Sequence, residues 1–335
     1  MQIHPLYKAK FHLKNYIFMA LIALELLMSF TFLGYIHIPP ISITFTYIPI
    51  IIAGCFLGPA QSTILGFIFG LASMYKASSY YVMPFDKVFS PFFSNFPAGS
   101  ILLNIGSRTL FGFLIGFIFI LVKKTKHRHL WTDIIAAFAH KLHAFFIYTA
   151  MGLFFPELGY RYTNTFQIGI GDLLISLLCM GTIEALWRII HQRSVQNFCS
   201  YVDQWSDTPY SRKYIFLLCS IFLFFTVCTA VASVFYFAQR ISYMLEYYGL
   251  EISAYVEHDL LHLQIQFLIA AFSLNFIMVL SILILYKYLS CREYLVGLDG
   301  LTGVMGRKMF AQYCDTVQKS NLSFPASADE KNGLY

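Results

Sequence analysis

The sequence predicts an all-α integral membrane protein whose chain crosses the bilayer about eight times. Hydrophobic residues make up 58% of the 335 residues and charged residues only 12%, whereas a soluble globular chain has about 25% charged residues. Phe (35) and Tyr (23) are abundant, which suits a surface that faces lipid. The net charge is +6, but the basic residues gather at the ends of apolar segments, so we expect a lipid bilayer and no nucleic acid as the partner.

The spans follow from the lengths of the apolar segments, because a helix that crosses the hydrocarbon core needs about 20 mostly apolar residues. The predicted spans are 16–36, 41–57, 59–75, 98–122, 131–154, 166–190, 214–238 and 265–287. The second and third are short and meet at Gly58 and Pro59, which predicts a tight helical hairpin. The first lacks a small-residue cleavage site, so we expect no cleavable signal peptide.

The positions of Lys and Arg predict the orientation, because cytoplasmic loops carry an excess of both. Basic residues flank the first, fourth, sixth, seventh and eighth spans on one side of the membrane. They are Lys8, Lys10, Lys14, Lys123, Lys124, Lys126, Arg128, Arg188, Arg193, Arg212, Lys213, Lys287 and Arg292. The other side carries only Lys76, Lys87, Arg161 and Arg240. We therefore expect a multi-pass protein of the cell membrane with both termini in the cytoplasm.

The chain divides into four predicted parts. Residues 1–190 form a six-helix bundle, and residues 191–213 form a basic cytoplasmic connector. Residues 214–287 form a transmembrane helix pair around an amphipathic extracytoplasmic loop, which we expect to be helical in part. Residues 288–335 form a polar cytoplasmic segment. The seven Cys residues show no C-x-x-C spacing, so the sequence predicts neither a disulfide framework nor a zinc site.

Ionisable residues inside the spans are the first candidates for function, because a charge in hydrocarbon costs several kcal/mol unless it is paired or hydrated. Glu25, Arg108, Lys141, Asp172 and Glu184 all lie in predicted helices. Either they pair with one another and hold the bundle together, or some face a water-filled pocket and bind a polar ligand. In the second case Arg108 and Asp172 are the preferred contacts, because their depth suits a cavity open to the outside.

The outside segment 75–96 is unusually rich in aromatic residues. Its rings form either an interfacial belt or a lid that stacks on a flat ring ligand. His140 and His143 give only a weak case for a metal, so we expect no metal site and no catalytic residue. The candidate ligand-binding residues are Arg108, Asp172, Glu25, Lys141, Tyr81 and Phe85.

Residues 38–119 carry a family resemblance in the stretches IPPISITFTYIPIIIAGCFLGPAQSTILGFIFGLAS and FSPFFSNFPAGSILLNIGSRTLFGFLIGF. They resemble the substrate-binding S components of energy-coupling-factor (ECF) vitamin transporters, particularly the folate/pantothenate-like group. The resemblance implies a six-helix domain over residues 1–190 that binds a vitamin-like small molecule near the outer face. The capping loops would be 34–40, 76–99 and 156–165.

Two small-residue patterns bear on packing and partners. The pairs Gly54/Gly58, Gly66/Gly70 and Gly112/Gly116 have the G-x-x-x-G spacing that lets helix backbones approach closely. S components that dock on an ECF transmembrane and ATPase module generally carry A-x-x-x-A on the first helix. Here the spacing is Ala20-x-x-Ala23, with Leu24 where the second Ala would be, so the resemblance implies binding more strongly than transport.

Residues 299–310 read DGLTGVMGRKMF and, by themselves, predict a turn followed by a helix. They also resemble the opening of GGDEF domains, the diguanylate cyclase family, whose entry motif is D-x-L-T-G-[LVI]-x-N-R. The matching residues are Asp299, Leu301, Thr302, Gly303 and Arg307. Gly306 stands where Asn is usual, and the G-G-[DE]-E-F motif is absent from this chain. We therefore expect a truncated stub that is not itself an enzyme; a longer form would use Mg²⁺ and GTP.

The resemblances imply two main functions. In the first, which we expect, the chain is a homodimeric membrane sensor for a vitamin-like molecule, and the helix pair relays occupancy to a cyclase that makes cyclic di-GMP in the full-length form. In the alternative, it is the S component of an ECF-type vitamin transporter. A membrane protein without either role is the third possibility.

Overall fold

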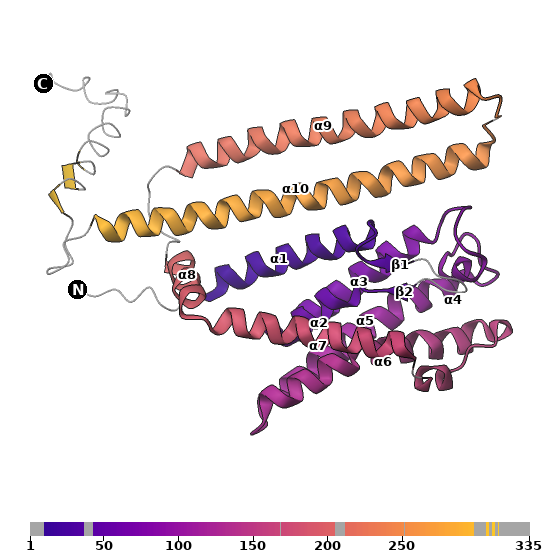
Figure 1. The fold of residues 1–335 in the computed structure, drawn as a ribbon, viewed down its shortest axis with the longest axis horizontal. Coiled ribbons are helices and arrows are strands. Elements are labelled where there is room, and N and C mark those ends of the chain that lie inside the picture. Colours follow the sequence, from indigo (N-terminus) through magenta and orange to yellow (C-terminus); the bar gives the residue numbers. More distant parts are fainter. Residues whose placement is uncertain are drawn as a thin grey trace, which may run out of the picture.

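The computed structural model describes residues 10–36, 43–167, 169–204, 212–250 and 252–297, together with Gly306, Arg307, Phe310, Ala311 and Cys314. Apart from one two-residue strand pair, the regular structure in these residues is helical, as the sequence predicts (Figure 1). The elements are α1 (Lys10–Ser29), β1 (Tyr35–Ile36), β2 (Ile43–Thr44), α2 (Tyr47–Phe56), α3 (Pro59–Lys76), α4 (Pro97–Ile101), α5 (Ser107–Lys123), α6 (Arg128–Phe154), α7 (Ile170–His191), α8 (Arg193–Gln204), α9 (Arg212–Tyr247) and α10 (Ala254–Val296).

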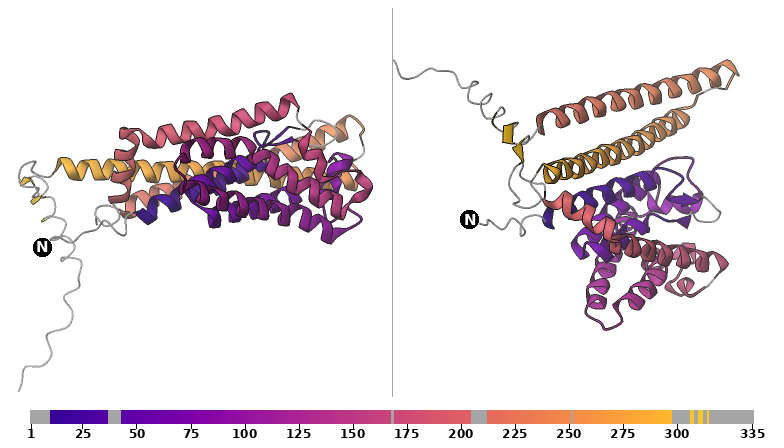
Figure 2. Two further views of the ribbon diagram at one scale, coloured as in Figure 1. Left: turned by 90° about the horizontal axis from the view of Figure 1, so that it is seen from below. Right: turned by 60° about the vertical axis from the view of Figure 1, so that its left-hand side comes forward.

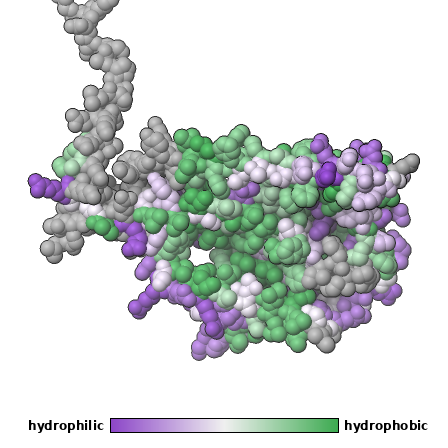
Figure 3. Space-filling view, turned by 45° about the horizontal axis from the view of Figure 1, so that its top comes forward, coloured by the Kyte–Doolittle hydropathy of each residue, from purple (hydrophilic) through white to green (hydrophobic). Residues whose placement is uncertain are grey.

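Each predicted span contains a helix, but the predicted bounds of the first two are wrong: α1 ends at Ser29, and β1 and β2 occupy parts of the predicted spans 16–36 and 41–57. Among the described residues, five helices are long and apolar enough to cross a membrane, and the number of eight crossings stays a prediction. The five are Pro97–Lys123, Arg128–Phe154, Gly171–His191, Leu217–Tyr247 and Ala254–Arg292. Hydrophobic residues cover the middle of the face in Figure 3, and hydrophilic ones gather toward the ends, as expected for a protein in a bilayer.

The predicted hairpin between α2 and α3 is confirmed. Gly58 has a φ of +128°, which a residue with a side chain rarely adopts, and Pro59 opens α3 directly after it. The predicted close packing is confirmed between α3 and α5. A Cβ atom on Gly66 would lie 2.3 Å from the Arg108 carbonyl oxygen, so this position needs a glycine.

The core lies among α1, α2, α3, α5, α6 and α7. Ile50, Leu65, Phe69, Phe111 and Ile115 are among its fully buried side chains. Between α4 and α5 the helix contains a π turn, Leu102–Gly106. Such turns leave backbone carbonyls with altered partners and often occur at functional sites. This one lies beside the cavity described below.

The helix pair α9–α10 lies along one side of the bundle in Figure 1 and in the right-hand view of Figure 2. α10 packs against α1 and α9, and α8 packs against α10. The predicted outside loop 239–264 is largely helical, because α9 continues to Tyr247 and α10 begins at Ala254. Gly249, with a φ of +70°, lies in the short turn between them.

The candidate cyclase motif falls almost wholly outside the described residues. Asp299, Leu301, Thr302 and Gly303 are not described, and Arg307 is described only as a helical, exposed position. The stub therefore stays a prediction.

Candidate functional site

A cavity of about 590 Å³ lies in the bundle beside the β1–β2 pair, which contributes Tyr35 and Thr44 to its lining. This volume falls in the range of small-molecule sites, about 300–1,000 Å³. Its walls come from the strand pair, the ends of α2 and α3, the loop after α3, and α5, α6 and α7. The lining side chains used below are Tyr35, Tyr47, Ser73, Lys76, Tyr81, Asp86, Phe89, Arg108, His140, His143, Ala144, Tyr148 and Asp172.

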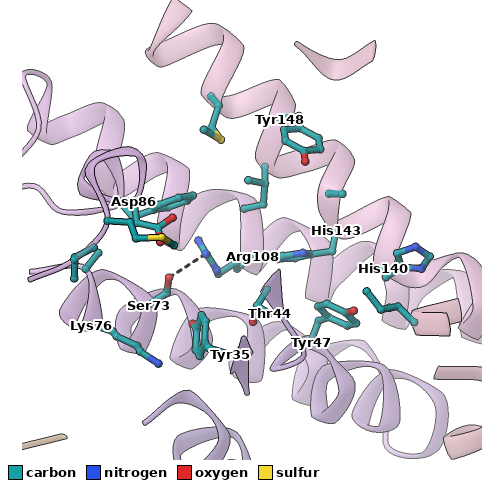
Figure 4. Close-up of a pocket in the computed structure, with 18 of the residues that line it drawn as sticks. Tyr35, Thr44, Tyr47, Ser73, Lys76, Asp86, Arg108, His140, His143 and Tyr148 are labelled. Carbon is teal, nitrogen blue, oxygen red and sulfur yellow. Dashed lines mark hydrogen bonds between the residues drawn. The ribbon is translucent and has the colours of Figure 1, made fainter. Parts of the chain in front are cut away.

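Arg108 reaches this cavity from α5 (Figure 4). Its Nη1 atom donates to the carbonyl oxygens of Leu103 (3.4 Å) and Asn104 (3.2 Å) in the π turn and to Asn104 Oδ1 (3.0 Å). Its Nη2 atom donates to Ser73 Oγ at 3.0 Å. The guanidinium carbon also lies 4.6 Å from the centre of the Phe69 ring. The π turn and α3 thus hold a positive charge in a fixed position.

Lys76, the last residue of α3, brings a second positive charge to the same end of the cavity. Its Nζ atom lies 3.8 Å from the centre of the Tyr35 ring and 3.4 Å from the Ser29 carbonyl oxygen. Among the described residues, no ion pair within 4 Å involves Lys76 or Arg108. Asp86 also lines this part of the wall, so the region contains charges of both signs.

Aromatic rings from α2 and α6 form another part of the cavity wall. Tyr47 from α2 and His143 from α6 lie with their ring centres 5.3 Å apart. His143 also packs on Phe69 and Phe111, and Tyr148 lies five positions further along α6 (Figure 4). Flat side chains of this kind pack well against a ring-shaped ligand.

Asp172 and Lys141 form the ion pair that one of the two sequence interpretations anticipated. Lys141 Nζ lies 2.9 Å from Asp172 Oδ2, which also accepts a hydrogen bond from the Gly169 backbone N–H at 2.9 Å. His140 Nε2 lies 3.6 Å from the other carboxylate oxygen. Asp172 and His140 line the cavity. Lys141 is not part of the lining and contacts it only through its ion pair with Asp172.

The remaining predicted contacts divide between the cavity and its surroundings. Tyr81 lines the cavity, and its hydroxyl accepts a hydrogen bond from Gln266 Nε2 at 3.2 Å. Glu25 is fully buried on α1 and Phe85 is exposed, and neither lines the cavity. Arg108, Asp172 and Tyr81 are therefore brought together, while Glu25, Lys141 and Phe85 are not part of the wall.

Sequence reasoning did not select Tyr35, Tyr47, Ser73, Lys76 or Tyr148 as site residues. Lys76 carried a usable signal, because it is a lone basic residue at the end of an apolar helix on the side that is poor in positive charge. Single Tyr and Ser residues in apolar helices carry no such signal.

A second polar cluster, His129, Asp133 and Glu184, lies away from the cavity, where α6 begins and α7 ends. His129 Nδ1 lies 3.1 Å from Asp133, and His129 Nε2 lies 3.1 Å from Glu184. Each ring nitrogen faces a different carboxylate, so a single metal ion could not use both contacts. The geometry fits a polar link between the two helices better than a metal centre.

The family model described as ECF transporter, substrate-specific component matches residues 17–195. The chain belongs to this family. The match runs from within α1 to the start of α8, so it includes every residue that lines the cavity, and it stops before α9 and α10. The sequence resemblance is confirmed at the level of the family, while the folate/pantothenate-like grouping stays a prediction. No curated protein and no solved structure matched the chain.

S components are multi-pass membrane proteins that bind small-molecule substrates and partner with an ECF module. The family therefore supports the alternative function, substrate binding for transport, better than the cyclase-linked sensor.

Proposed function

We propose that this S component binds a small organic molecule in the cavity and delivers it to an ECF module for uptake. One observation carries the proposal: the residues that match the family are the same residues that enclose the cavity. The predicted orientation assigns the cavity to the extracytoplasmic side, from which a nutrient would arrive. The hypothesis of a cyclase-linked sensor has less support, because the family match ends at residue 195, well before the candidate cyclase motif.

The lining favours a molecule with a flat ring and an acidic group. Lys76 and Arg108 supply positive charge within reach of Ser73 and Tyr35, which offer hydroxyl groups. Charge-assisted hydrogen bonds to a carboxylate are about twice as strong as neutral ones, so these residues suit an acidic group. The rings of Tyr47, His143 and Tyr148 would contact the flat part of the molecule.

Thermal unfolding of the purified full-length chain tests the proposal. Bound ligand stabilises the fold by RT ln(1 + [L]/Kd), about 2.7 kcal/mol at a hundredfold excess over Kd. We expect at least one water-soluble vitamin to raise the unfolding temperature. Native mass spectrometry of the protein as extracted from cells should show one small molecule bound per chain. For the substrate class, 4-aminobenzoate should stabilise the protein more than its neutral amide, 4-aminobenzamide.

A matched pair of variants shows whether the cavity is the site. Ala144→Trp fills the cavity from α6, whereas Leu153→Trp adds the same side chain at an exposed position of the same helix. We expect Ala144→Trp alone to abolish the ligand-induced stabilisation, with both variants eluting as the parent does in gel filtration. A vitamin response that survives Ala144→Trp, or the absence of any response and of any co-purified molecule, would overturn the proposal.

A further inference from the structure

α10 is mostly apolar, but among its described residues His262, Gln266 and Ser273 are buried polar side chains. Ser273 bonds within its own helix, to the Ile269 carbonyl oxygen. His262 and Gln266 are only 6% and 5% exposed, whereas Leu261, on a different face of α10, is 56% exposed. Buried polar groups in proteins are almost always hydrogen-bonded, because burial without a partner costs free energy. This face of α10 therefore has a specific polar neighbour.

The neighbour is the end of α3 and the loop that follows it. His262 Nε2 lies 2.8 Å from the Tyr75 carbonyl oxygen, and the rings of the two residues stack with centres 4.3 Å apart. Gln266 Nε2 lies 2.8 Å from His262 Nδ1 and donates to the Tyr81 hydroxyl at 3.2 Å. A single tautomer satisfies this chain, in which Gln266 donates to His262 and His262 donates to Tyr75.

One turn earlier on α10, a second group of contacts holds the same segment. Asp259 Oδ1 accepts a hydrogen bond from the Tyr80 backbone N–H at 2.8 Å. The Tyr80 ring meets the rings of Tyr255 and His258 edge-on, with centres 4.8 and 5.2 Å apart. Side chains over about three turns of α10 thus contact the segment 75–81.

The segment 75–81 is also part of the cavity wall. Lys76, Ala77, Tyr81, Val82 and Met83 all line the cavity, so Tyr81 contacts both the cavity and α10. α10 lies outside the part of the chain that matches the S-component family. A helix added to the family domain therefore contacts the wall of that domain's binding site.

We propose that α10 is a latch on the cavity. Asp259, His262 and Gln266 hold the segment 75–81 in the cavity wall, and the cavity opens for ligand exchange when α10 releases this segment. This inference adds a ligand-responsive helix to the binding function. By linkage, a ligand that binds beneath the closed segment must also favour the docked position of α10.

α10 can carry this state to the other end of the molecule. His262 and Tyr288 lie about 39 Å apart along one uninterrupted helix, at 1.5 Å per residue. The Tyr288 ring lies 4.8 Å from the ring of Phe198 on α8, and Lys287 Nζ lies 4.8 Å from the centre of the Tyr16 ring on α1. A movement of α10 on release would therefore alter its contacts with α1 and α8 at this junction. Relaying ligand occupancy in this way is the role that the sequence predicted for the helix pair.

The rate at which a thiol inside the cavity reacts tests the latch without knowledge of the ligand. Ala144→Cys places a small reporter on the α6 wall, and the helix Arg128–Phe154 contains no native cysteine. The purified full-length protein is treated with N-ethylmaleimide, and modification of the α6 peptide is followed by mass spectrometry. Gln266→Ala removes the bonds to Tyr81 and His262, and we expect it to raise the rate at least about fivefold, the effect that loss of one typical net hydrogen bond has on an opening equilibrium. His262→Ala should raise it further.

Gln264→Ala is the matched control. It removes a glutamine side chain two positions before Gln266, and Gln264 makes none of the contacts with Tyr81 and His262. Its reaction rate should equal that of the reporter alone. If the alanine variants unfold, Tyr81→Phe decides, because it keeps the ring and removes only the oxygen that accepts from Gln266. A reporter that reacts at the parent's rate in folded latch variants, or that stays unreactive in all of them, overturns the inference. An equal increase in Gln264→Ala does so too.

Discussion

The bundle α1–α7 and the helix pair α9–α10 differ in how many of their side chains they bury. The bundle buries a continuous core and places buried polar side chains such as Asn104, Arg108 and His143 around the cavity. The helix pair exposes most of its large apolar side chains; Phe224 and Phe237 on α9 are 63% and 67% exposed. Its buried His262 and Gln266 are satisfied through the bundle. The bundle thus has its own basis for stability, while the pair depends on the bundle for its polar contacts.

The largest effect that separates the two regions should come from the backbone contact between α3 and α5. Gly66→Ala would place Cβ 2.3 Å from the Arg108 carbonyl oxygen, so the helices must move apart, at a cost of about 3 kcal/mol. Thermal unfolding in detergent should show this loss. Gly181→Ala on α7 has open space around its Cβ and should be neutral or slightly stabilising. Equal losses in both would mean that α3 and α5 do not pack as described.

Arg108→Ala should produce the next largest effect. It leaves the carbonyl oxygens of Leu103 and Asn104 without this donor, and an unsatisfied buried polar group costs about 1–3 kcal/mol. We expect reduced stability with the bundle still inserted in the membrane, and loss of binding of an acidic ligand in a thermal-shift titration. Arg108→Lys keeps the charge and should recover part of the binding. Full binding by the alanine variant would make Arg108 a purely structural residue.

Removal of the helix pair tests the independence of the bundle. A chain that ends at Gln204 keeps α1 to α8 and loses the contacts of α10 with α1 and with the segment 75–81. We expect a folded bundle with a smaller drop in unfolding temperature than Gly66→Ala causes. A thiol introduced by Ala144→Cys should then react quickly. Failure of this chain to fold would show that the helix pair is part of the bundle's core.

The smallest effect should come from the Lys141–Asp172 pair. Its side chains are 19% and 30% exposed, and partly solvated ion pairs contribute about 0–1 kcal/mol. Asp172→Asn should therefore shift the unfolding temperature slightly, and less in high salt. Glu246→Gln, at an exposed position of α9, serves as the control and should show no shift. A large loss in Asp172→Asn would place this pair in the core of the fold.

Local chemistry in the sequence was enough to predict the fold class, the helices and much of their packing. A long apolar segment is helical in a membrane whatever surrounds it, because its backbone groups must bond within the segment. The hairpin at Gly58 and the close approach at Gly66 follow from what a missing Cβ atom permits. The outside loop 239–264 was expected to be helical in part, and this is confirmed. The sequence did not predict how far its helices extend, because the α10 end makes contacts with the segment 75–81 that the sequence does not display.

The sequence by itself determined that this is a membrane protein with an S-component domain and with ionisable residues inside its predicted spans. Only the tertiary structure decided which of those side chains share a cavity. It placed Arg108, Asp172 and Tyr81 in the wall and left Glu25 and Phe85 out of it. It also joined Tyr75 and Tyr81 to His262 and Gln266, nearly two hundred positions away. The physical reason is that such contacts depend on how each helix is rotated about its own axis, and packing against the neighbouring helices sets that rotation.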